Sequence, residues 1–272
     1  MKSFCAAILV LIVMMFCSMP VLAQDWNYHI VDDNNYIGYR TQIVATSDGT
    51  PYILYKDRSF YNLYLAHWVS AGGDDGYWDR MQIDQYTRYT DDIEMLCDAN
   101  DHLHMAWSRY SPSGSIKYAV YDPGTETWVI PEEEVAAKEA SLDLAIYDDE
   151  GTIIPSIALI NRDSELEVMT RDMVGGTWSV EYLFDYSLVQ YAPSIAADTS
   201  GYLHVSFYDA TGDNLMYATN ANAMETWTYE YVDIEGNVGS RSSIVIDEGN
   251  IPYIVYYDTS NGDLKYAKLI SE

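Results

Sequence analysis

Apolar and polar residues alternate along this chain in short runs, and the runs recur in one order. An apolar segment is followed by a turn rich in Asp, Asn and Gly, then by a second segment rich in aromatic and β-branched residues. A third segment reads Leu-x-Tyr-Ala in its clearest copies, and a fourth begins at a tryptophan. Segments of this composition, bounded by turn residues, predict β-strands joined by tight turns. No stretch shows helical periodicity of useful length, and the one helix-friendly segment, 132–140, is predicted to form a loop or a single turn.

Two sets of residues mark a repeat of nearly constant length. The tryptophans are spaced by 52, 50, 50 and 49 residues and stand at Trp26, Trp78, Trp128, Trp178 and Trp227. Aspartates keep step with them at Asp98, Asp148, Asp198 and Asp247, with Thr46 at the corresponding place in the first copy. Self-similarity at a fixed period of this size is the signature of propellers and repeat arrays. The sequence therefore predicts an all-β protein: a five-bladed β-propeller of four-stranded antiparallel blades, in a single domain over residues 24–272.

The last copy of the repeat is incomplete. It ends at Glu272 without a fourth segment and without a tryptophan, whereas residues 26–32 match residues 227–233 in pattern. We expect residues 26–32 to complete the last blade as its outer strand, because this pairing closes the ring and removes unpaired sheet edges. The alternative is an open solenoid, which would leave two unlike ends that need caps.

Residues 1–23 have the pattern of a secretory signal peptide, with a positive charge at Lys2, an apolar run over 6–16 and small or aliphatic residues up to Ala23. A secreted or periplasmic protein is therefore predicted, with no membrane span in the mature chain. The chain has 42 acidic and 14 basic residues and a net charge of −28. A field of this sign repels nucleic acids, anionic membranes and sulfated polysaccharides through non-specific contacts, and it suits cations or neutral ligands. Cys97 is the only cysteine beyond residue 23, so the stability must come from an apolar core.

The turn-and-strand unit resembles the repeats of secreted bacterial β-propellers. The resemblance rests on the segments Pro-Ser-Ile-Ala at 193–196, Asp-Thr-Ser-Gly at 198–201 and Leu-Met-Tyr-Ala at 215–218. The unit is also distantly similar to the Asp-box, or BNR-like, repeats of sialidase-type propellers. It departs from them after the glycine, where an Asp box has Thr-Trp and this chain has Tyr202-Leu203. The resemblance implies the fold. Five-bladed examples include glycoside hydrolases with carboxylates at the central funnel and sugar-binding lectins with one site per blade, and this chain has no motif specific to either.

The aromatic residues are expected to serve two purposes. The repeated tryptophans are interpreted as packing anchors between blades, because large aromatic side chains dominate core energetics. The 26 tyrosines exceed what a core of this size can hide, so several should be exposed, where they suit carbohydrate or peptide surfaces.

Candidate site residues come from the start of each first strand, which lines the central channel of a propeller. Departures from the repeat in this place are informative, because the average repeat residue serves the fold. Six residues before each marker the chain has, in order, Arg40, Asp92, Leu142, Ala192 and Arg241. The next two columns add the acidic residues Asp143 and Glu94.

In a closed ring Arg40 and Arg241 would stand side by side, with Asp92, Glu94 and Asp143 on the next two blades. The arginines could hold a carboxylate of a uronate or a peptide in bidentate fashion. Two of the acids could then act as general acid and general base of a glycosidase. The structural alternative is that the arginines neutralise the acids at a crowded axis, without catalysis.

The second strands end in residues that should border the same face, Tyr208-Asp209 and Tyr257-Asp258. Their repetition indicates either equivalent shallow ligand sites or ordinary turn chemistry. The histidines fall on different blades or strands, so no metal site and no cofactor are predicted. Acidic loops at 32–35 and 72–75 could bind extracellular Ca²⁺ weakly.

The sequence predicts a secreted binding or scaffold propeller that recognises a glycan or an extracellular protein through its central face. The similarity of the copies favours a scaffold or a multi-site binder, because a catalytic site needs asymmetry about the axis. The alternative is a glycoside hydrolase or polysaccharide lyase with Asp92, Glu94 and Asp143 at the central channel.

Overall fold

The computed structural model describes residues 27–34, 37–72, 75–85, 92–109, 114–136, 140–161, 163–184, 189–222, 224 and 226–270. The chain divides into residues 1–30 and residues 31–272. Of the first part only residues 27–30 are described, and they form neither strand nor helix. The predicted signal peptide, 1–23, and Trp26 lie outside the described residues.

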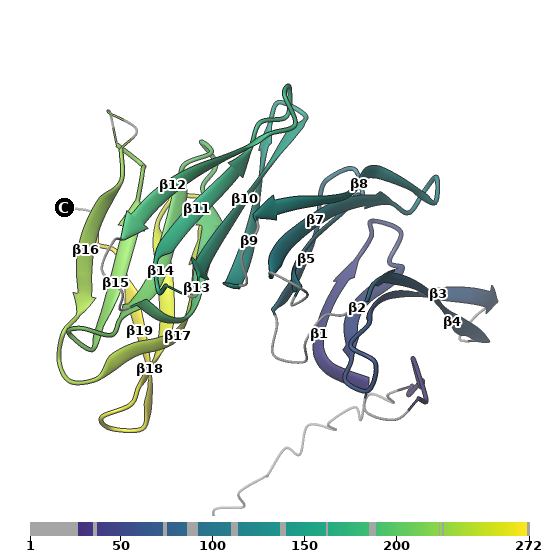
Figure 1. Cartoon of the computed structure of the whole chain (residues 1–272), viewed down its shortest axis with the longest axis horizontal. Helices are drawn as coiled ribbons and strands as arrows, with labels where there is room; N and C mark the ends of the chain where they lie inside the picture. The colour runs from purple at the N-terminus through teal and green to yellow at the C-terminus, as the bar shows by residue number, and fades with distance from the viewer. Residues whose placement is uncertain are drawn as a thin grey trace, which may run out of the picture. The chain divides into compact units, whose positions relative to one another are not determined.

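Residues 31–272 form antiparallel sheets whose strands follow one another along the chain (Figure 1). The first sheet contains β1 (Ile37–Ala45), β2 (Pro51–Asp57), β3 (Leu63–Gly72) and β4 (Asp75–Asp84). The second contains β5 (Ile93–Cys97), β6 (Leu103–Arg109), β7 (Ser115–Asp122) and β8 (Thr127–Ala136). The third contains β9 (Ala140–Asp149), β10 (Thr152–Asn161), β11 (Leu166–Arg171) and β12 (Trp178–Phe184). The fourth contains β13 (Val189–Ala197), β14 (Leu203–Asp209), β15 (Asn214–Thr219) and β16 (Thr228–Asp233). The fifth contains β17 (Val238–Ile246), β18 (Pro252–Asp258) and β19 (Asp263–Lys268).

The predicted all-β class is confirmed, since the described residues contain no helix. The fold is propeller-like, with one sheet per sequence repeat and four strands in each of the first four sheets. The fifth sheet has three strands. Residues 27–34 contain no strand, so the outer strand predicted for the last blade is not formed in the structure.

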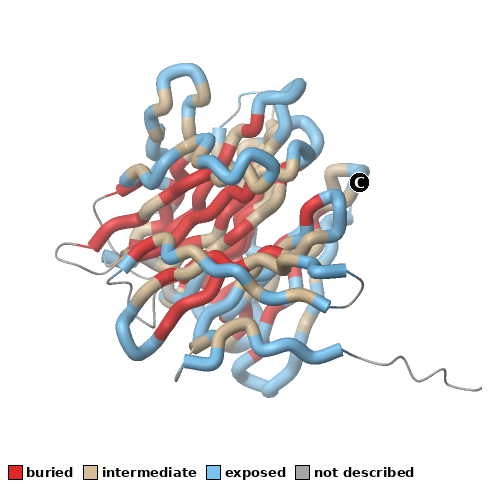
Figure 2. Tube along the Cα trace, turned by 90° about the vertical axis from the view of Figure 1, so that its right-hand side faces the viewer, coloured by how far each residue is buried: buried red, intermediate tan, exposed pale blue. Residues whose placement is uncertain are grey.

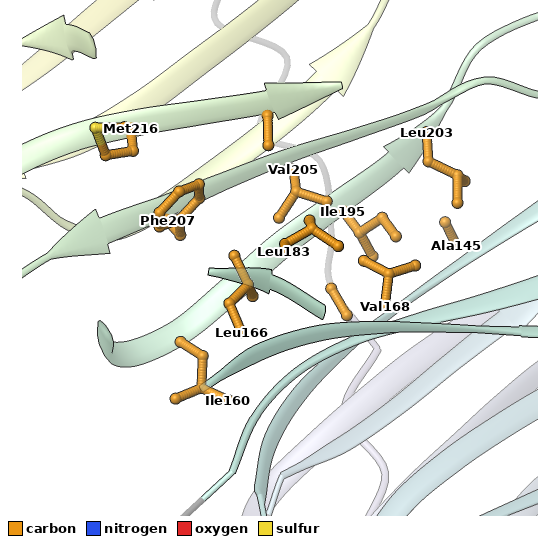
Figure 3. Packing of buried hydrophobic residues seen from close by; sticks show 12 residues of the cluster. Ala145, Ile160, Leu166, Val168, Leu183, Ile195, Leu203, Val205, Phe207 and Met216 are labelled. Carbon is orange, nitrogen blue, oxygen red and sulfur yellow. The ribbon is translucent and has the colours of Figure 1, made fainter. Parts of the chain in front are cut away.

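Successive sheets pack through apolar faces. The first strands β1, β5, β9, β13 and β17 contact one another in chain order, and an apolar cluster fills each of the four junctions. Figure 3 shows the cluster between the third and fourth sheets, where Val168 and Leu166 meet Ile195 and Phe207. Buried residues run along the middle of many strands, whereas exposed residues gather at turns and strand ends (Figure 2). The described residues show no comparable packing between β17 and β1.

The tryptophans of the repeat are packing anchors at three of these junctions, which confirms their predicted role. Trp128 packs against the cluster between the first and second sheets, Trp178 against the next cluster and Trp227 against the one after it. Trp178 also donates its indole N–H to Glu133 at 2.9 Å. Each anchor therefore fixes how one sheet lies on its predecessor.

The loop or single turn predicted over 132–140 is wrong for residues 132–136, which belong to strand β8. Lys117 on the neighbouring strand forms ion pairs with Glu132 at 3.2 Å and Glu134 at 3.7 Å. Glu133 points to the other side and accepts from Arg171 at 2.7 Å. These partners offset the repulsion of three adjacent glutamates and override their weak strand propensity. Residues 137–139 lie outside the described residues.

The aspartates of the repeat close the turns between first and second strands. Asp98 Oδ1 accepts the backbone N–H groups of Asn100 and His102, both at 2.8 Å. Asp198 and Asp247 make the same pair of bonds in their own copies. A side-chain oxygen that satisfies two turn N–H groups explains why an acid recurs at this position.

A second set of aspartates, at the ends of outer strands, binds the next sheet. Trp107 donates to Asp84 at 2.8 Å and Tyr256 donates to Asp233 at 2.7 Å, and in both pairs the partners are 23 residues apart. Tyr55 donates to Asp32 at 2.9 Å with the same separation of 23 residues. Asp32 therefore makes the same contact to the first sheet that Asp84 makes to the second sheet and Asp233 makes to the fifth.

One face of the fifth sheet and one face of the first sheet are exposed, whereas the equivalent faces of the other sheets are buried. Leu264 is 79% exposed and Tyr266 is 62% exposed, whereas the corresponding residues of the fourth sheet, Leu215 and Tyr217, are 0% and 5% exposed. On the first sheet Ile43 is 66% exposed. At the other junctions the equivalent positions are buried against a neighbouring sheet. The first and fifth sheets therefore each expose a face with apolar side chains of the kind that fill those junctions.

Candidate functional site

A polar pocket lies where first strands of all five sheets converge. Its volume is about 580 Å³, within the range of small-molecule sites. It brings together all five charged residues that the sequence identified at the strand entries, Arg40, Asp92, Glu94, Asp143 and Arg241. The remaining lining residues are Ser141, Leu142, Tyr191, Ala192, Pro193, Ser194, Ser242 and Ser243.

The first two sheets are joined at the pocket by an ion pair and two hydrogen bonds. Arg40 on β1 forms an ion pair with Asp92 at 3.1 Å. Gln42 donates its amide to Glu94 at 2.7 Å and to the carbonyl oxygen of Ile93 at 3.2 Å. Burial raises the pKa of Glu94 to about 8, and the negative charges of the nearby aspartates add to the effect. At neutral pH Glu94 is therefore largely a protonated acid that can donate a hydrogen bond.

Asp143 joins the third sheet to the fourth. It accepts from the hydroxyl of Ser194 at 2.9 Å and from the backbone N–H of Ile195 at 2.8 Å, both on β13. Burial raises the pKa of Asp143, and these hydrogen bonds oppose the rise by stabilising the carboxylate. Ser194 in turn accepts the N–H of Ile244 at 3.2 Å, which connects the fourth sheet to the fifth. Glu94 and Asp143 therefore each form hydrogen bonds that connect two neighbouring sheets.

The strands that reach the pocket are irregular at its edge. The pairing register shifts in β1 between Ile37 and Thr41, in β13 between Gln190 and Ser194, and in β17 on both sides of Ser240. Bulges of this kind redirect side chains and are frequent beside functional sites.

The other four predicted residues lie outside the pocket lining. Tyr208 is buried, donates to Asp213 at 2.5 Å and packs against the ring of Tyr191 at 5.5 Å between centroids. Asp209 accepts the N–H of Thr211 at 2.9 Å, and Asp258 accepts both the N–H and the side-chain amide of Asn261. Tyr257 is exposed. Three of the four, Tyr208 and the two aspartates, therefore have local structural partners at the ends of their strands.

Sequence reasoning missed the two pocket residues at the position directly before the counted column, Tyr191 and Ser141. Extending the count back by one residue would have found both. Ser194, Ser242 and Ser243 fell within the counted columns but were not chosen as site residues, because a serine carries no charge that distinguishes it from a turn residue.

Within the described ranges, no cluster of three or more His, Cys, Asp or Glu residues is arranged to hold a metal ion. The two loops considered for Ca²⁺ are described only in part. None of the described segments forms a helix of the length and apolar character needed to cross a membrane.

No protein-family model matches the chain, and none of the curated proteins matches it. Solved structures are similar to it in fold. A protein of unknown function from Dyadobacter fermentans has a TM-score of 0.56 and 15% identity, over 86% of this chain and 79% of that one. A variant of AofleA from Arthrobotrys oligospora with three arginines replaced by alanine has a TM-score of 0.54 and 10% identity, over 85% and 69%. A GH43 β-xylosidase/α-arabinofuranosidase from a compost metagenome reaches a TM-score of 0.41 and 13% identity, over 87% and 92%. At these identities the first two likenesses concern the fold alone, and the third carries no conclusion.

Proposed function

We propose that this chain is an exported five-bladed β-propeller that binds a glycan or an extracellular protein at the pocket lined by its first strands. Export is supported by the signal-like pattern of residues 1–23. The observation that carries the binding function is the convergence of five charged residues, on or directly before four strands, in one pocket of about 580 Å³.

Ring closure by residues 26–32 is part of this proposal. The hydrogen bond between Tyr55 and Asp32 supports it, because it repeats the bonds that Asp84 and Asp233 make to the following sheet. The uncovered apolar faces of the first and fifth sheets also support it. Pairing of residues 26–32 with the edge of β19 would give the fifth sheet its fourth strand and bring these faces together.

Closure is tested by Leu264→Ala with Leu215→Ala as the matched variant. Truncation of a buried leucine costs about 2–5 kcal/mol, and truncation of an exposed one costs about 0.5 kcal/mol or less. Leu215 is fully buried and sets the scale. A closed ring predicts that Leu264→Ala lowers the free energy of unfolding by a comparable amount in urea titrations. A loss below about 0.5 kcal/mol at Leu264 would show that the face stays open to solvent.

Binding is favoured over hydrolysis by the hydrogen bonds of the carboxylates. Asp143 holds the fourth sheet, Asp92 is paired with Arg40, and Glu94 accepts from Gln42. Groups committed in this way are poor candidates for proton transfer to a substrate, which needs a carboxyl free to reach the reacting atom. They are well suited to hold the walls of a binding pocket.

A glycoside hydrolase or lyase with Asp92, Glu94 and Asp143 is the second candidate, and one observation favours it. Burial raises the pKa of Glu94 to about 8, which is the protonation state that a general acid requires at neutral pH. Under this function Glu94→Gln abolishes release of reducing ends from the bound polysaccharide. Under the binding function no reducing ends are released by either protein.

The binding function is tested by a glycan-array screen of the mature protein, with and without Ca²⁺, beside the double variant Arg40→Ala/Arg241→Ala. Arg58→Ala is the matched control, since Arg58 also stacks on a tyrosine but lies outside the pocket lining. If the double variant loses binding and Arg58→Ala does not, the result supports the pocket as the ligand site. Binding that survives in it would move the site to the repeated blade surfaces, and no glycan binding would favour a protein ligand.

A further inference from the structure

Two residues at the edge of the pocket have backbone conformations that side chains disfavour. Tyr191 on β13 has a φ of 68° and Arg241 on β17 has a φ of 56°. Both lie inside strands, at bulges, and neither is a glycine or an asparagine. A left-handed conformation costs about 1–3 kcal/mol for such residues and is characteristic of ligand sites, where the strain fixes a side chain in place.

The two strained residues face each other. The guanidinium carbon of Arg241 lies 5.9 Å from the centre of the Tyr191 ring. Arg241 is exposed, and no described carboxylate pairs with it, whereas Arg40 on the same pocket is neutralised by Asp92. In a chain with 42 acidic and 14 basic residues, an arginine without an acidic partner is unusual. Its planar fork is free to bind a carboxylate through two parallel hydrogen bonds.

The charges around Arg241 permit an anion to enter, although the whole chain is strongly negative. Arg40 and Asp92 compensate each other. Burial raises the pKa of Glu94 to about 8, so at neutral pH this acid adds little negative charge to the pocket. At an ionic strength near 0.15 M, charges more than about 8 Å away are largely screened. Of the two arginines at the pocket, Arg241 is therefore the one that no described carboxylate neutralises.

The rest of the lining suits a sugar better than a peptide. Ser141 and Ser243 place hydroxyl groups at the pocket, and half-exposed Tyr191 offers a ring face. Hydroxyls beside an aromatic face match the alternating polar and apolar sides of a pyranose ring. Peptides are usually recognised by main-chain pairing along a sheet edge or by an apolar groove, whereas charged residues and serines make up most of this lining.

We propose that the pocket binds an acidic sugar residue of a glycan, with its carboxylate on Arg241 and its ring on Tyr191. The proposal rests on the proposed function, since it names the ligand class of the same pocket. Arg40 stays with Asp92 and shapes the opposite wall.

The test is titration calorimetry of the mature protein with three probes: trigalacturonic acid, its methyl ester and neutral galactotriose. The acid is expected to bind at least 10-fold more tightly than the ester, which has the same rings without the charge. Arg241→Gln should remove this difference by weakening binding of the acid to the level of the ester, while Arg58→Gln should bind all probes as the wild type does. Arg241→Lys, which keeps the charge without the fork, should retain part of the preference.

Equal binding of acid and ester by the wild type would overturn the acidic class and leave glycan binding at the pocket intact. An unchanged preference in a folded Arg241→Gln variant would also overturn it. If no sugar binds and a peptide with a free C-terminal carboxylate binds through Arg241, the ligand is a protein, and both glycan proposals fall.

Discussion

Replacing Glu94 by glutamine should make the protein less sensitive to alkaline pH. Glu94 accepts a hydrogen bond from Gln42 at 2.7 Å, and burial raises its pKa from 4.5 to about 8. A glutamine has nearly the same shape, can still accept this bond through its carbonyl oxygen, and does not titrate. The variant thus fixes the side chain in a neutral form at every pH.

The sign and size of the effect follow from proton linkage. Between pH 4.5 and about 8 the folded protein holds a proton that the unfolded chain releases, so the free energy of unfolding of the wild type falls as pH rises. Each pH unit corresponds to about 1.4 kcal/mol, which gives an upper bound of about 5 kcal/mol over this window. Because the carboxyl is partly exposed to the pocket, we expect roughly 2–3 kcal/mol. The contribution is complete below pH 4.5 and is lost as pH passes 8.

The assay is urea unfolding followed by tryptophan fluorescence at pH 5, 7 and 8.5 and constant ionic strength. The stability of Glu94→Gln relative to the wild type should rise by about 2–3 kcal/mol between the first and last pH. Glu248→Gln, which changes an exposed glutamate in a turn, is the control and should show a flat difference. A flat difference for Glu94→Gln as well would refute the reasoning, because it would mean that Glu94 ionises normally in the folded protein.

Two further outcomes are expected. Burial lowers the pKa of His104 and of His204, so the unfolded chain binds protons first and the free energy of unfolding should fall as pH drops below 6.5. In thermal melts at pH 5 to 7, the double variant His104→Gln/His204→Gln should reduce this loss by up to about 1.4 kcal/mol per histidine and pH unit. An unchanged pH dependence would contradict the assignment. Gly239→Ala should lower the free energy of unfolding in urea by more than about 2 kcal/mol, because the φ of Gly239 is 99° and a new Cβ would lie 2.6 Å from the backbone of Leu215. Gly49 has a φ of 86° but open space around it, so Gly49→Ala should cost only about 1 kcal/mol. Equal losses in the two variants would exclude the close contact as the cause.

The repeat in the sequence was sufficient for the strands, the turns and the anchors. Asp98 and Asp198 recur because one carboxylate oxygen accepts two turn N–H groups, a local requirement that any copy of the turn must meet. Trp128 and Trp178 recur because each junction between sheets needs a large apolar side chain at the same place. Such local and periodic requirements can be seen in one chain without its partners.

The strand over residues 132–136 could not be predicted in this way. Three glutamates in a row have weak strand propensity, and their pattern is compatible with a helix or a loop. Lys117 and Arg171, which come from other strands, supply the compensating charges. Only the pairing of strands brings those cations to that position.

The same division holds for the candidate site. Counting back from the aspartate markers was enough to place Arg40, Asp92, Glu94 and Arg241 at one pocket, because residues at equal positions in successive repeats meet around a common axis. The sequence alone did not determine which of these charges would be neutralised. The tertiary structure decided this. It pairs Asp92 with Arg40, buries Glu94 and, through bulges in β17, turns Arg241 toward Tyr191. These features depend on distances between strands, which a repeat pattern does not contain.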